Sequence, residues 1–524
     1  SYLIWLNGAS FFQSYVNPRQ KARQGRSSLM PSLLNVLSAT PDETSLLQGV
    51  KRNEAFLSRE GGNVVSAYFG SDFYHMSIVP LALVTCLLAY QALPSKSNGM
   101  ELPMGFTKFQ ASYLVAWALC VGADWLQGPY VYALYAAYGF SVNEIAQLFV
   151  AGFGSALFFS CFVGSLADQF GRKKGCLAYC FFYIVSCTTK HFKNYWILMF
   201  GRFTGGLATS LLFSCFECWM VSEHTKRNAF PARLLDNMFG MQYTIMYLVA
   251  ILSGFTAQGA SDAYTFQPIS KDSTIWYGGN VSPFDMSAAL LVVAMAYIAF
   301  AWEENYGQTT DFHRDNDTLK NLKEGMSHLI NTPSFMQLCV VIACFEGAMY
   351  AFVFNWSPSL QYTGGPDPPY GIIFSLFMMA CMCGASTATL TSNMAKPASR
   401  LAGLISLAVL SFALSSATSA VAPPGVYFAF CSFLIFEFCV GVYFPTVGIL
   451  KSEIVPEHIR GTVYNLYRVP LNAVVVCLLL THLTFGQCFK ICAVLLIAAF
   501  CATVGLLRRK QQYGEDAPES AKLP

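Results

Sequence analysis

The chain has 524 residues, of which 54% are hydrophobic, 15% are aromatic and 12% are charged, with a formal net charge of +3. Soluble globular proteins carry roughly 25% charged residues, so this composition excludes an ordinary water-soluble protein and indicates lipid as the solvent. The small net charge gives no support to a nucleic-acid-binding function.

Long apolar runs divide the chain into predicted membrane spans. A spanning helix needs about 20 mostly apolar residues, and no comparable run alternates with the period of two that a membrane barrel requires. We therefore predict an all-α, multi-pass integral membrane protein in a lipid bilayer. In chain order, the predicted spans are 74–93, 107–137, 143–168, 173–190, 194–222, 232–257, 284–302, 332–357, 370–394, 400–421, 424–450, 458–483 and 487–507.

The N-terminal part of the chain, residues 1–73, is a polar extension of unknown role. Two interpretations stay open: a targeting segment, or a biological start at Met76. We favour the start at Met76, which makes 74–93 an extra N-terminal transmembrane helix ahead of the main body.

The remaining spans form two sets of six. The N-terminal half covers 107–302 and the C-terminal half covers 332–507, with a polar linker, 303–331, between them. The polar tail, 508–524, follows the last span, and we expect it to be disordered.

Positive side chains are unevenly distributed between the two sides of the predicted membrane. Cytoplasmic loops of membrane proteins are enriched in Lys and Arg, and most loop cations here, Lys451 among them, fall on the side of the linker and the tail. The opposite side holds Lys190, Lys193 and Lys271. This asymmetry predicts a cytoplasmic linker and a cytoplasmic C-terminus, and we expect the plasma membrane as the location.

Chemical features of the first half recur at nearly the same spacing in the second. Each half has an acid in its first span, an acid in its fourth span and a proline before its fifth. A parallel duplication explains this recurrence, and transporters are often built from such repeats, with the substrate site between them near the midplane. The matched pairs are Asp124 and Glu346, Glu217 and Glu437, and Pro231 and Pro456.

The first span of the N-terminal half contains the stretch CVGADWLQGPYVYALY, with Asp124 and the pair Gly128-Pro129. A charged residue at the bilayer centre costs roughly 2.5–3.5 kcal/mol on insertion scales, so it should face the bundle interior or water. Gly-Pro frees backbone groups that a cavity or a neighbouring helix must satisfy. We interpret the stretch as a binding-site wall; the alternative is that Asp124 pairs with Arg202 or another buried cation only to hold helices together.

The stretch GSLADQFGRKKG, residues 164–175, joins the second and third spans of the N-terminal half. It resembles the G-x-L-a-D-x-x-G-R-K signature of the major facilitator superfamily, and GRFTGG, residues 201–206, is similar to a second signature of that superfamily. The resemblance implies two six-helix bundles, here with one extra N-terminal helix. It also implies a conformational lock, in which a glycine permits close helix contact and an acid pairs with a neighbouring span. The lock motif comprises Gly164, Asp168, Gly171, Arg172 and Lys173.

A closer resemblance covers most of residues 107–507 and rests on long signatures in both halves. The chain is similar to the eukaryotic molybdate-anion transporter family, and this implies uptake of the molybdate oxyanion. The signatures are ADWLQGPYVYALY, GRFTGGLATSLLFSCFECW, PYGIIFSLFMMA, GVYFPTVGILKSEIVPE and NLYRVPLNAV.

An oxyanion needs cations or N–H donors, and two arginines lie within predicted spans. Arg468 lies two residues before Pro470, which marks an interrupted helix, and Tyr464 and Asn465 are its polar neighbours. Arg202 lies in the fourth span. Because the guanidinium group offers a fork of donors suited to an oxyanion, we predict these four residues as substrate-binding. For Arg468 the alternative is a salt bridge with Glu346 or Glu437.

Four acids in the predicted spans are candidates for coupling. Moving a dianion inward against a negative membrane potential costs about 2.3 kcal/mol per charge per 100 mV, so a coupling proton or cation would compensate. The alternative for these acids is interior pairing. They are Asp124, Glu217, Glu346 and Glu437.

Two other functions stay open: transport of a neutral or organic solute such as a sugar, and a non-transporting membrane scaffold or sensor. The sequence has no phosphate-binding glycine loop with a following Lys-Ser/Thr, and its seven histidines are scattered. We therefore predict no enzymatic activity, no cofactor and no metal site.

Overall fold

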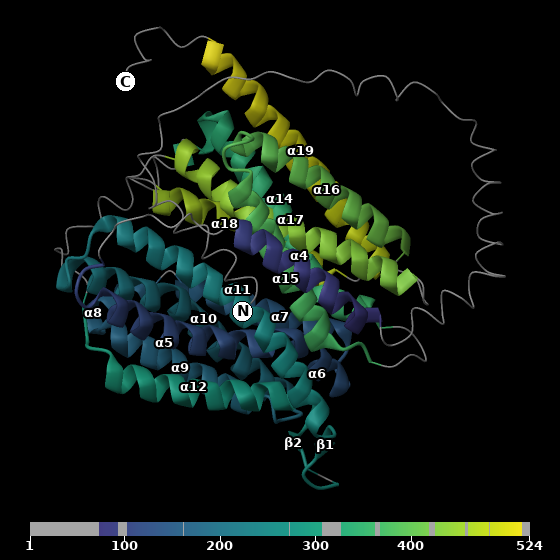
Figure 1. Cartoon of the computed structure of the whole chain (residues 1–524). Coiled ribbons are helices and arrows are strands. Elements are labelled where there is room, and N and C mark those ends of the chain that lie inside the picture. The colour runs from purple at the N-terminus through teal and green to yellow at the C-terminus, as the bar shows by residue number, and fades with distance from the viewer. Residues whose placement is uncertain are drawn as a thin grey trace, which may run out of the picture.

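Figure 1 shows the chain as a computed structural model. The N-terminal extension before Phe73 and most of the linker lie outside the described residues, so the predictions for them stay untested. The structure describes residues 73–92, 102–160, 162–271, 273–306, 326–327, 329–361, 367–418, 425–455, 460–481 and 483–515.

The helices of the N-terminal half form one bundle, drawn in blue and teal in Figure 1. Within it, α10 packs against α7 and α9, and α5 packs against α11 and α12. The long helices are α5 (Phe106–Gln127), α7 (Val142–Ser160), α9 (Arg172–Thr189), α10 (Tyr195–Ser222), α11 (Ala232–Ala263) and α12 (Ser282–Ala301). The short elements are η2 (Gly128–Tyr130), α6 (Val131–Ala137), α8 (Val163–Phe170), η3 (Glu223–Arg227), η4 (Gly279–Val281), β1 (Gln267–Pro268) and β2 (Trp276–Tyr277).

The helices of the C-terminal half form a second bundle, drawn in green and yellow. Here α17 packs against α15 and α16, α19 packs against α14 and α16, and α18 packs against α14. The helices are α14 (Pro333–Ser359), α15 (Tyr370–Leu390), α16 (Pro397–Thr418), α17 (Gly425–Ile454), α18 (Arg460–Leu480) and α19 (Phe485–Glu515).

The bundles meet along α11 with α15, α7 with α18, and α6 with α14. Aromatic rings fill part of this seam: the Phe149 ring lies 5.3 Å from that of Phe354, and Phe153 lies 5.3 Å from Tyr350. Helix α4 (Phe73–Ala92) comes first in the chain but packs against α15 of the second bundle (Figure 1). The predicted extra helix is therefore attached to the C-terminal half.

Ten of the described helices are long and apolar enough to cross a membrane. The predicted spans 107–137 and 173–190 also contain long helices, α5 and α9, but these are more polar and fall outside that set. In the predicted span 458–483, the described residues of α18 include the shorter apolar stretch Leu466–Leu480. Most of α5 is buried by its neighbours. A helix enclosed by other helices meets less lipid, so it tolerates more polar residues than a lipid-facing one.

The break predicted in the first span is present. Helix α5 ends at Gln127, a single 3₁₀ turn covers Gly128–Tyr130, and α6 continues from Val131. Proline removes a backbone donor and prevents a regular helix at this point. Asp124 therefore lies one turn before a real interruption, as expected.

Two loop cations and part of the tail differ from the sequence predictions. Lys190 is 1% exposed at the end of α9, and Lys451 is 4% exposed within α17. Both are buried because neighbouring helices cover the turn that follows the apolar run.

The expectation of a disordered tail was wrong for residues 508–515, which continue α19. Arg, Lys and Gln in this segment are good helix formers.

The turn between α9 and α10 is bound to the β-hairpin and to α12 through His191. One ring nitrogen of His191 lies 2.9 Å from the Trp276 carbonyl oxygen, and the other lies 2.8 Å from the Asp285 carboxylate. When the ring is protonated, both nitrogens donate. The hydrogen bond with Asp285 is the main cause that raises the pKa of His191 above its usual value of 6.5.

This raised pKa predicts a pH-dependent stability. A group whose folded pKa is raised contributes stability that is fully present below its unfolded pKa of about 6.5 and is lost as pH rises through the folded pKa. We expect the melting temperature of the purified protein to fall as pH rises through that window. Asp285→Asn should remove this part of the pH dependence; superimposable curves for wild type and variant, in thermal unfolding against pH, would contradict the assignment.

Candidate functional site

The predicted lock motif is a helix–glycine–helix corner, not a loop. Helix α8 ends at Phe170 and α9 begins at Arg172, with Gly171 between them at φ 114°. Glycine is favoured at such a positive φ. The expected close helix contact at Gly164 was wrong for this conformation, because a Cβ there would meet open space.

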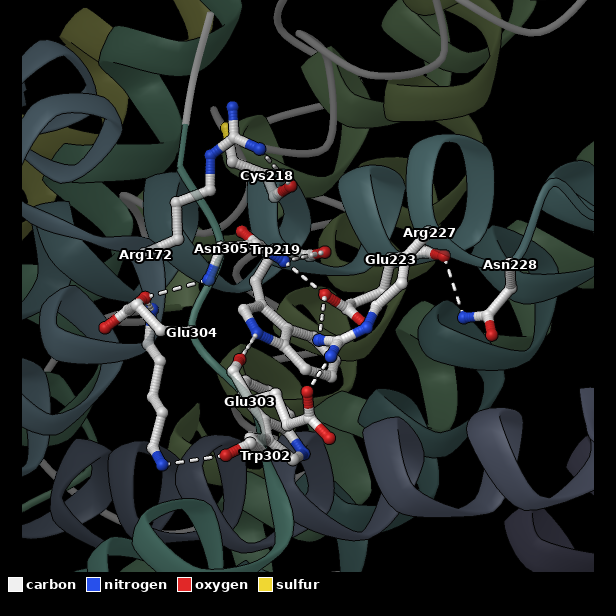
Figure 2. Close-up of polar contacts among 11 residues, drawn as sticks. Arg172, Cys218, Trp219, Glu223, Arg227, Asn228, Trp302, Glu303, Glu304 and Asn305 are labelled. Atoms are coloured by element: carbon white, nitrogen blue, oxygen red, sulfur yellow. Dashed lines mark hydrogen bonds and ion pairs between the residues drawn. The ribbon is translucent and has the colours of Figure 1, made fainter.

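Asp168 and Arg172 form the polar contact of this corner. The Arg172 Nε atom donates to Asp168 Oδ1 at 2.7 Å. Arg172 Nη1 donates to the Cys218 carbonyl oxygen at 3.1 Å (Figure 2). Asp168 thus contacts a residue one turn away in sequence, and Arg172 carries the connection onward to α10. The lock motif is tied to its own bundle in this conformation.

Glu304, just after α12, closes the other side of the corner. Its carboxylate accepts from the backbone N–H of Lys173 at 2.7 Å and of Lys174 at 3.1 Å. The Lys173 ammonium donates to the carbonyl oxygen of Trp302 at 2.7 Å. An acid at a helix N-terminus satisfies free N–H groups and the helix dipole, so the segment after α12 is fastened to the start of α9.

The neighbouring residues of that segment bind the end of α10. The Trp302 and Trp219 rings stack with centroids 3.7 Å apart, and Trp219 Nε1 donates to the Glu303 carbonyl oxygen at 2.9 Å. Arg227 forms ion pairs with both Glu223 and Glu303 (Figure 2). Residues 302–304 therefore connect α9, α10 and α12 at one end of the first bundle.

The two candidate acids of the first bundle are buried and hydrogen-bonded to neutral groups. Tyr183 of α9 donates to Asp124, which is 2% exposed. Gln242 of α11 donates to Glu217 at 3.1 Å, and Tyr113 donates to Gln242 at 2.9 Å. These contacts connect α5, α9, α10 and α11 in the bundle interior.

Arg202 does not form the ion pair with Asp124 that was the alternative interpretation of these two residues. Its Nε donates to the Leu148 carbonyl oxygen at 3.1 Å, and its guanidinium lies over the Phe149 ring at 5.2 Å. In the described part of the chain, no carboxylate lies within 4.0 Å of its nitrogen atoms. Arg202 lines a small polar cavity of about 20 Å³ with Gln127 and Tyr183, which is room for roughly one water molecule.

Lys190 is a second buried cation near Arg202. Its ammonium lies over the Tyr135 ring at 5.5 Å and within electrostatic range of Arg202. Its side chain is 1% exposed at the end of α9. The interior of the first bundle therefore carries positive charge that the sequence analysis assigned to a loop.

The second bundle brings Glu346 of α14 close to two cations. Glu346 is fully buried and accepts from the Tyr443 hydroxyl at 3.1 Å. Lys451 of α17 and Arg468 of α18 lie within electrostatic range of this carboxylate. Yet no carboxylate is within 4.0 Å of either cation's nitrogen atoms, over the residues that the structure describes. The alternative role of Arg468, a salt bridge with Glu346, is therefore not formed in this structure: the two groups interact electrostatically without direct contact.

Tyr464 joins this cluster through Lys451, whose ammonium lies 5.3 Å from the Tyr464 ring centroid. Glu437 is fully buried elsewhere in α17. The side chain of Asn465 lies outside what the structure describes. The described residues hold no group of three or more His, Cys, Asp or Glu arranged for a metal ion.

The sequence analysis missed Lys451, Tyr443, Tyr183 and Glu304 as members of these polar clusters. The sequence did contain an indication for Lys451, because this lysine directly follows the long apolar run in GVYFPTVGILK. A cation in that position is either a headgroup anchor or the last buried turn, and the sequence does not distinguish them.

Known proteins resemble this chain in sequence and in fold. Residues 73–442 match a family described as sugar transporters with twelve transmembrane segments. The molybdate-anion transporter of Xenopus laevis is 32% identical over 82% of this chain and 94% of its own length. That of Takifugu rubripes is 31% identical over 84% of this chain and 95% of its own length.

Solved transporters share the fold at low sequence identity. The inward-open xylose transporter XylE from E. coli covers 76% of this chain and 95% of its own length, with a TM-score of 0.57 and 12% identity. The nucleoside transporter NupG covers 76% and 98%, with a TM-score of 0.55 and 10% identity. These matches confirm the predicted fold. Together with the relatives' identity, they show that the chain belongs to the molybdate-anion transporter family within the major facilitator superfamily.

Proposed function

We propose that this chain carries the molybdate oxyanion across a membrane by alternating access between its two bundles. The supporting observation is the pair of cations Lys451 and Arg468, which no described carboxylate contacts. A dianion that leaves water loses strong hydration, and fixed charge or several N–H donors must replace it. Relatives at about 32% identity bear the name molybdate-anion transporter.

Arg468 is the proposed principal substrate contact, with Tyr464 and Asn465 as its neighbours on α18. Arg202 is the proposed contact from the first bundle. The cavity of about 20 Å³ beside Arg202 is too small for a tetrahedral oxyanion. Arg202 would therefore reach the substrate only in another conformation of the cycle.

Coupling and orientation complete the proposal. A proton or cation travels with the dianion, carried by the buried acids Asp124, Glu217, Glu346 and Glu437. The Lys and Arg distribution supports a cytoplasmic linker and C-terminus, and the plasma membrane is the proposed location.

The test is uptake of radiolabelled molybdate by cells that lack their own uptake system. Expression of this chain should confer saturable uptake that unlabelled molybdate suppresses, and competition by tungstate and sulfate would measure the selectivity. Normal surface expression without any uptake above that of vector-only cells would overturn the proposal.

A sugar or other neutral solute is the second candidate substrate. Two observations favour it: the matched family is described as sugar transporters, and a D-xylose-proton symporter shares the fold at 11% identity. A neutral solute would need amides and aromatic rings in the site and not paired cations. Labelled xylose uptake in the same cells distinguishes the two.

The lock motif supplies a separate prediction. Asp168→Asn removes the charge that holds Arg172 at 2.7 Å and should weaken the α8–α9 corner in the conformation that it stabilises. We expect a lower maximal transport rate with substrate affinity in the outward-facing state near that of wild type. Large loss of affinity with a normal rate would contradict a lock and would indicate a direct role in binding.

A further inference from the structure

Glu346 has one oxygen atom that is not satisfied. Its Oε1 accepts from Tyr443, whereas Oε2 is buried and has no hydrogen-bond partner among the residues that the structure describes. A buried carboxylate oxygen without a donor is costly. Protonation, or a group that arrives during transport, would relieve that cost.

The charges around Glu346 favour one particular exchange. With Glu346 ionised, the cluster of Glu346, Lys451 and Arg468 carries one net positive charge, and a bound dianion would turn this into one net negative charge. With Glu346 protonated, the two cations balance the dianion. Since net charge in a buried site is strongly unfavourable, the dianion should enter together with one proton.

We propose that Lys451 and Arg468 together bind the oxyanion, and that Glu346 is their counter-ion in the empty site and takes up one proton when the oxyanion replaces it. The inference rests on the proposed function and assigns coupling to Glu346 among the four buried acids. The proton comes from water on the entry side, binds at Oε2, where it donates toward the oxyanion, and returns to water on the exit side.

Among the titratable groups around α14, Glu346 is the one whose protonation would balance the charge of the bound dianion. From α17 and α18 come the two cations and a neutral phenol, and α19 contributes thiols, one of which donates to the Ala348 carbonyl oxygen at 3.9 Å. The contact with α6 is aromatic. The titratable side chains that these elements bring to α14 include Tyr443, Lys451, Arg468, Tyr467, Cys488, Cys492 and Tyr132.

The test uses the purified full chain in proteoliposomes, with the membrane potential clamped at zero by potassium and valinomycin. Counterflow of labelled molybdate, without a gradient, measures binding and cycling. Uptake driven by an imposed pH gradient measures coupling, and one unit of gradient should give a one-proton carrier roughly tenfold accumulation. Glu346→Gln should keep counterflow and lose this accumulation, whereas Lys451→Gln should lose both. Glu144→Gln, at a half-buried position in the first turn of α7, is the matched control and should keep both.

The outcomes separate the two proposals. Wild-type protein that shows no molybdate counterflow would overturn the proposed function itself. Wild-type counterflow together with pH-driven accumulation by Glu346→Gln would overturn the present inference alone. A measurement on wild-type protein does not depend on the variants folding: molybdate added to weakly buffered protein should cause uptake of about one proton per oxyanion bound. Binding without proton uptake would also overturn the inference.

Discussion

Arg468→Gln is expected to abolish molybdate uptake in protein that still reaches the membrane. The substitution leaves Lys451 as the remaining cation near Glu346, and removing one partner of a buried, hydrogen-bonded charge pair typically costs about 2–5 kcal/mol of binding. A loss of that size is roughly thirtyfold to a few thousandfold in affinity. Uptake rate and surface expression, measured on the same cells, check the result.

Two further variants separate a substrate contact from a structural one. Arg468→Lys keeps the charge but loses the planar fork of donors, so we expect weaker binding with some transport left. The double variant Arg468→Gln with Glu346→Gln also removes the carboxylate charge of Glu346, which Arg468 would otherwise balance. If Arg468 only holds Glu346, this double variant should recover exchange; if Arg468 binds the oxyanion, it should stay inactive. Arg468→Gln that transports molybdate at the wild-type rate would remove Arg468 from the site and favour the neutral solute.

The sequence predicted the fold because lipid imposes a simple rule on it. Every backbone polar group in the membrane must be satisfied internally, so long apolar runs become helices, and the Gly128-Pro129 pair marks the one place where the first span must break. Helices α5 and α9 lie where spans were predicted, although both are more polar than the ten helices that are apolar enough to cross a membrane. Hydropathy reports the average residue of a span, so it does not show how much of a helix its neighbours cover.

The polar clusters were less predictable because they depend on which helices meet. Asp124 and Glu346 were expected to be related by duplication, and each accepts from a tyrosine. Tyr183 comes from α9 and Tyr443 from α17, which do not correspond between the halves. The duplication stays a prediction, and the local partner of each acid has to be read from the packing.

Glu304 is a second residue whose contacts could not be predicted from the sequence. The sequence analysis placed it in a polar linker, where an acid has no special role. Its carboxylate in fact caps α9 at the lock motif, far away along the chain. A helix N-terminus attracts acids in general, but sequence alone does not tell which acid arrives there.

Gly254→Leu is expected to reduce transport at least tenfold by wedging the two bundles apart. Gly254 of α11 faces Gly371 of α15, and a Cβ at Gly254 would lie 2.5 Å from the Gly371 carbonyl oxygen and 3.0 Å from the Ser375 nitrogen. Both are backbone atoms, which cannot move aside as the end of a flexible side chain can. Overpacking typically costs about 1–3 kcal/mol, and about 2 kcal/mol shifts an equilibrium roughly thirtyfold.

The same helix offers a matched control. Gly259 of α11 has open space where a Cβ would lie, so Gly259→Leu changes helix propensity equally without touching α15. We expect Gly259→Leu to transport near the wild-type rate, with both variants compared at equal surface expression in the molybdate uptake assay. Equal transport by the two variants would show that the α11–α15 contact is not needed in the cycle. A selective loss in Gly254→Leu would mean that the bundles must close along this seam in one of the alternating states, because the wedge penalises only conformations in which α11 and α15 touch.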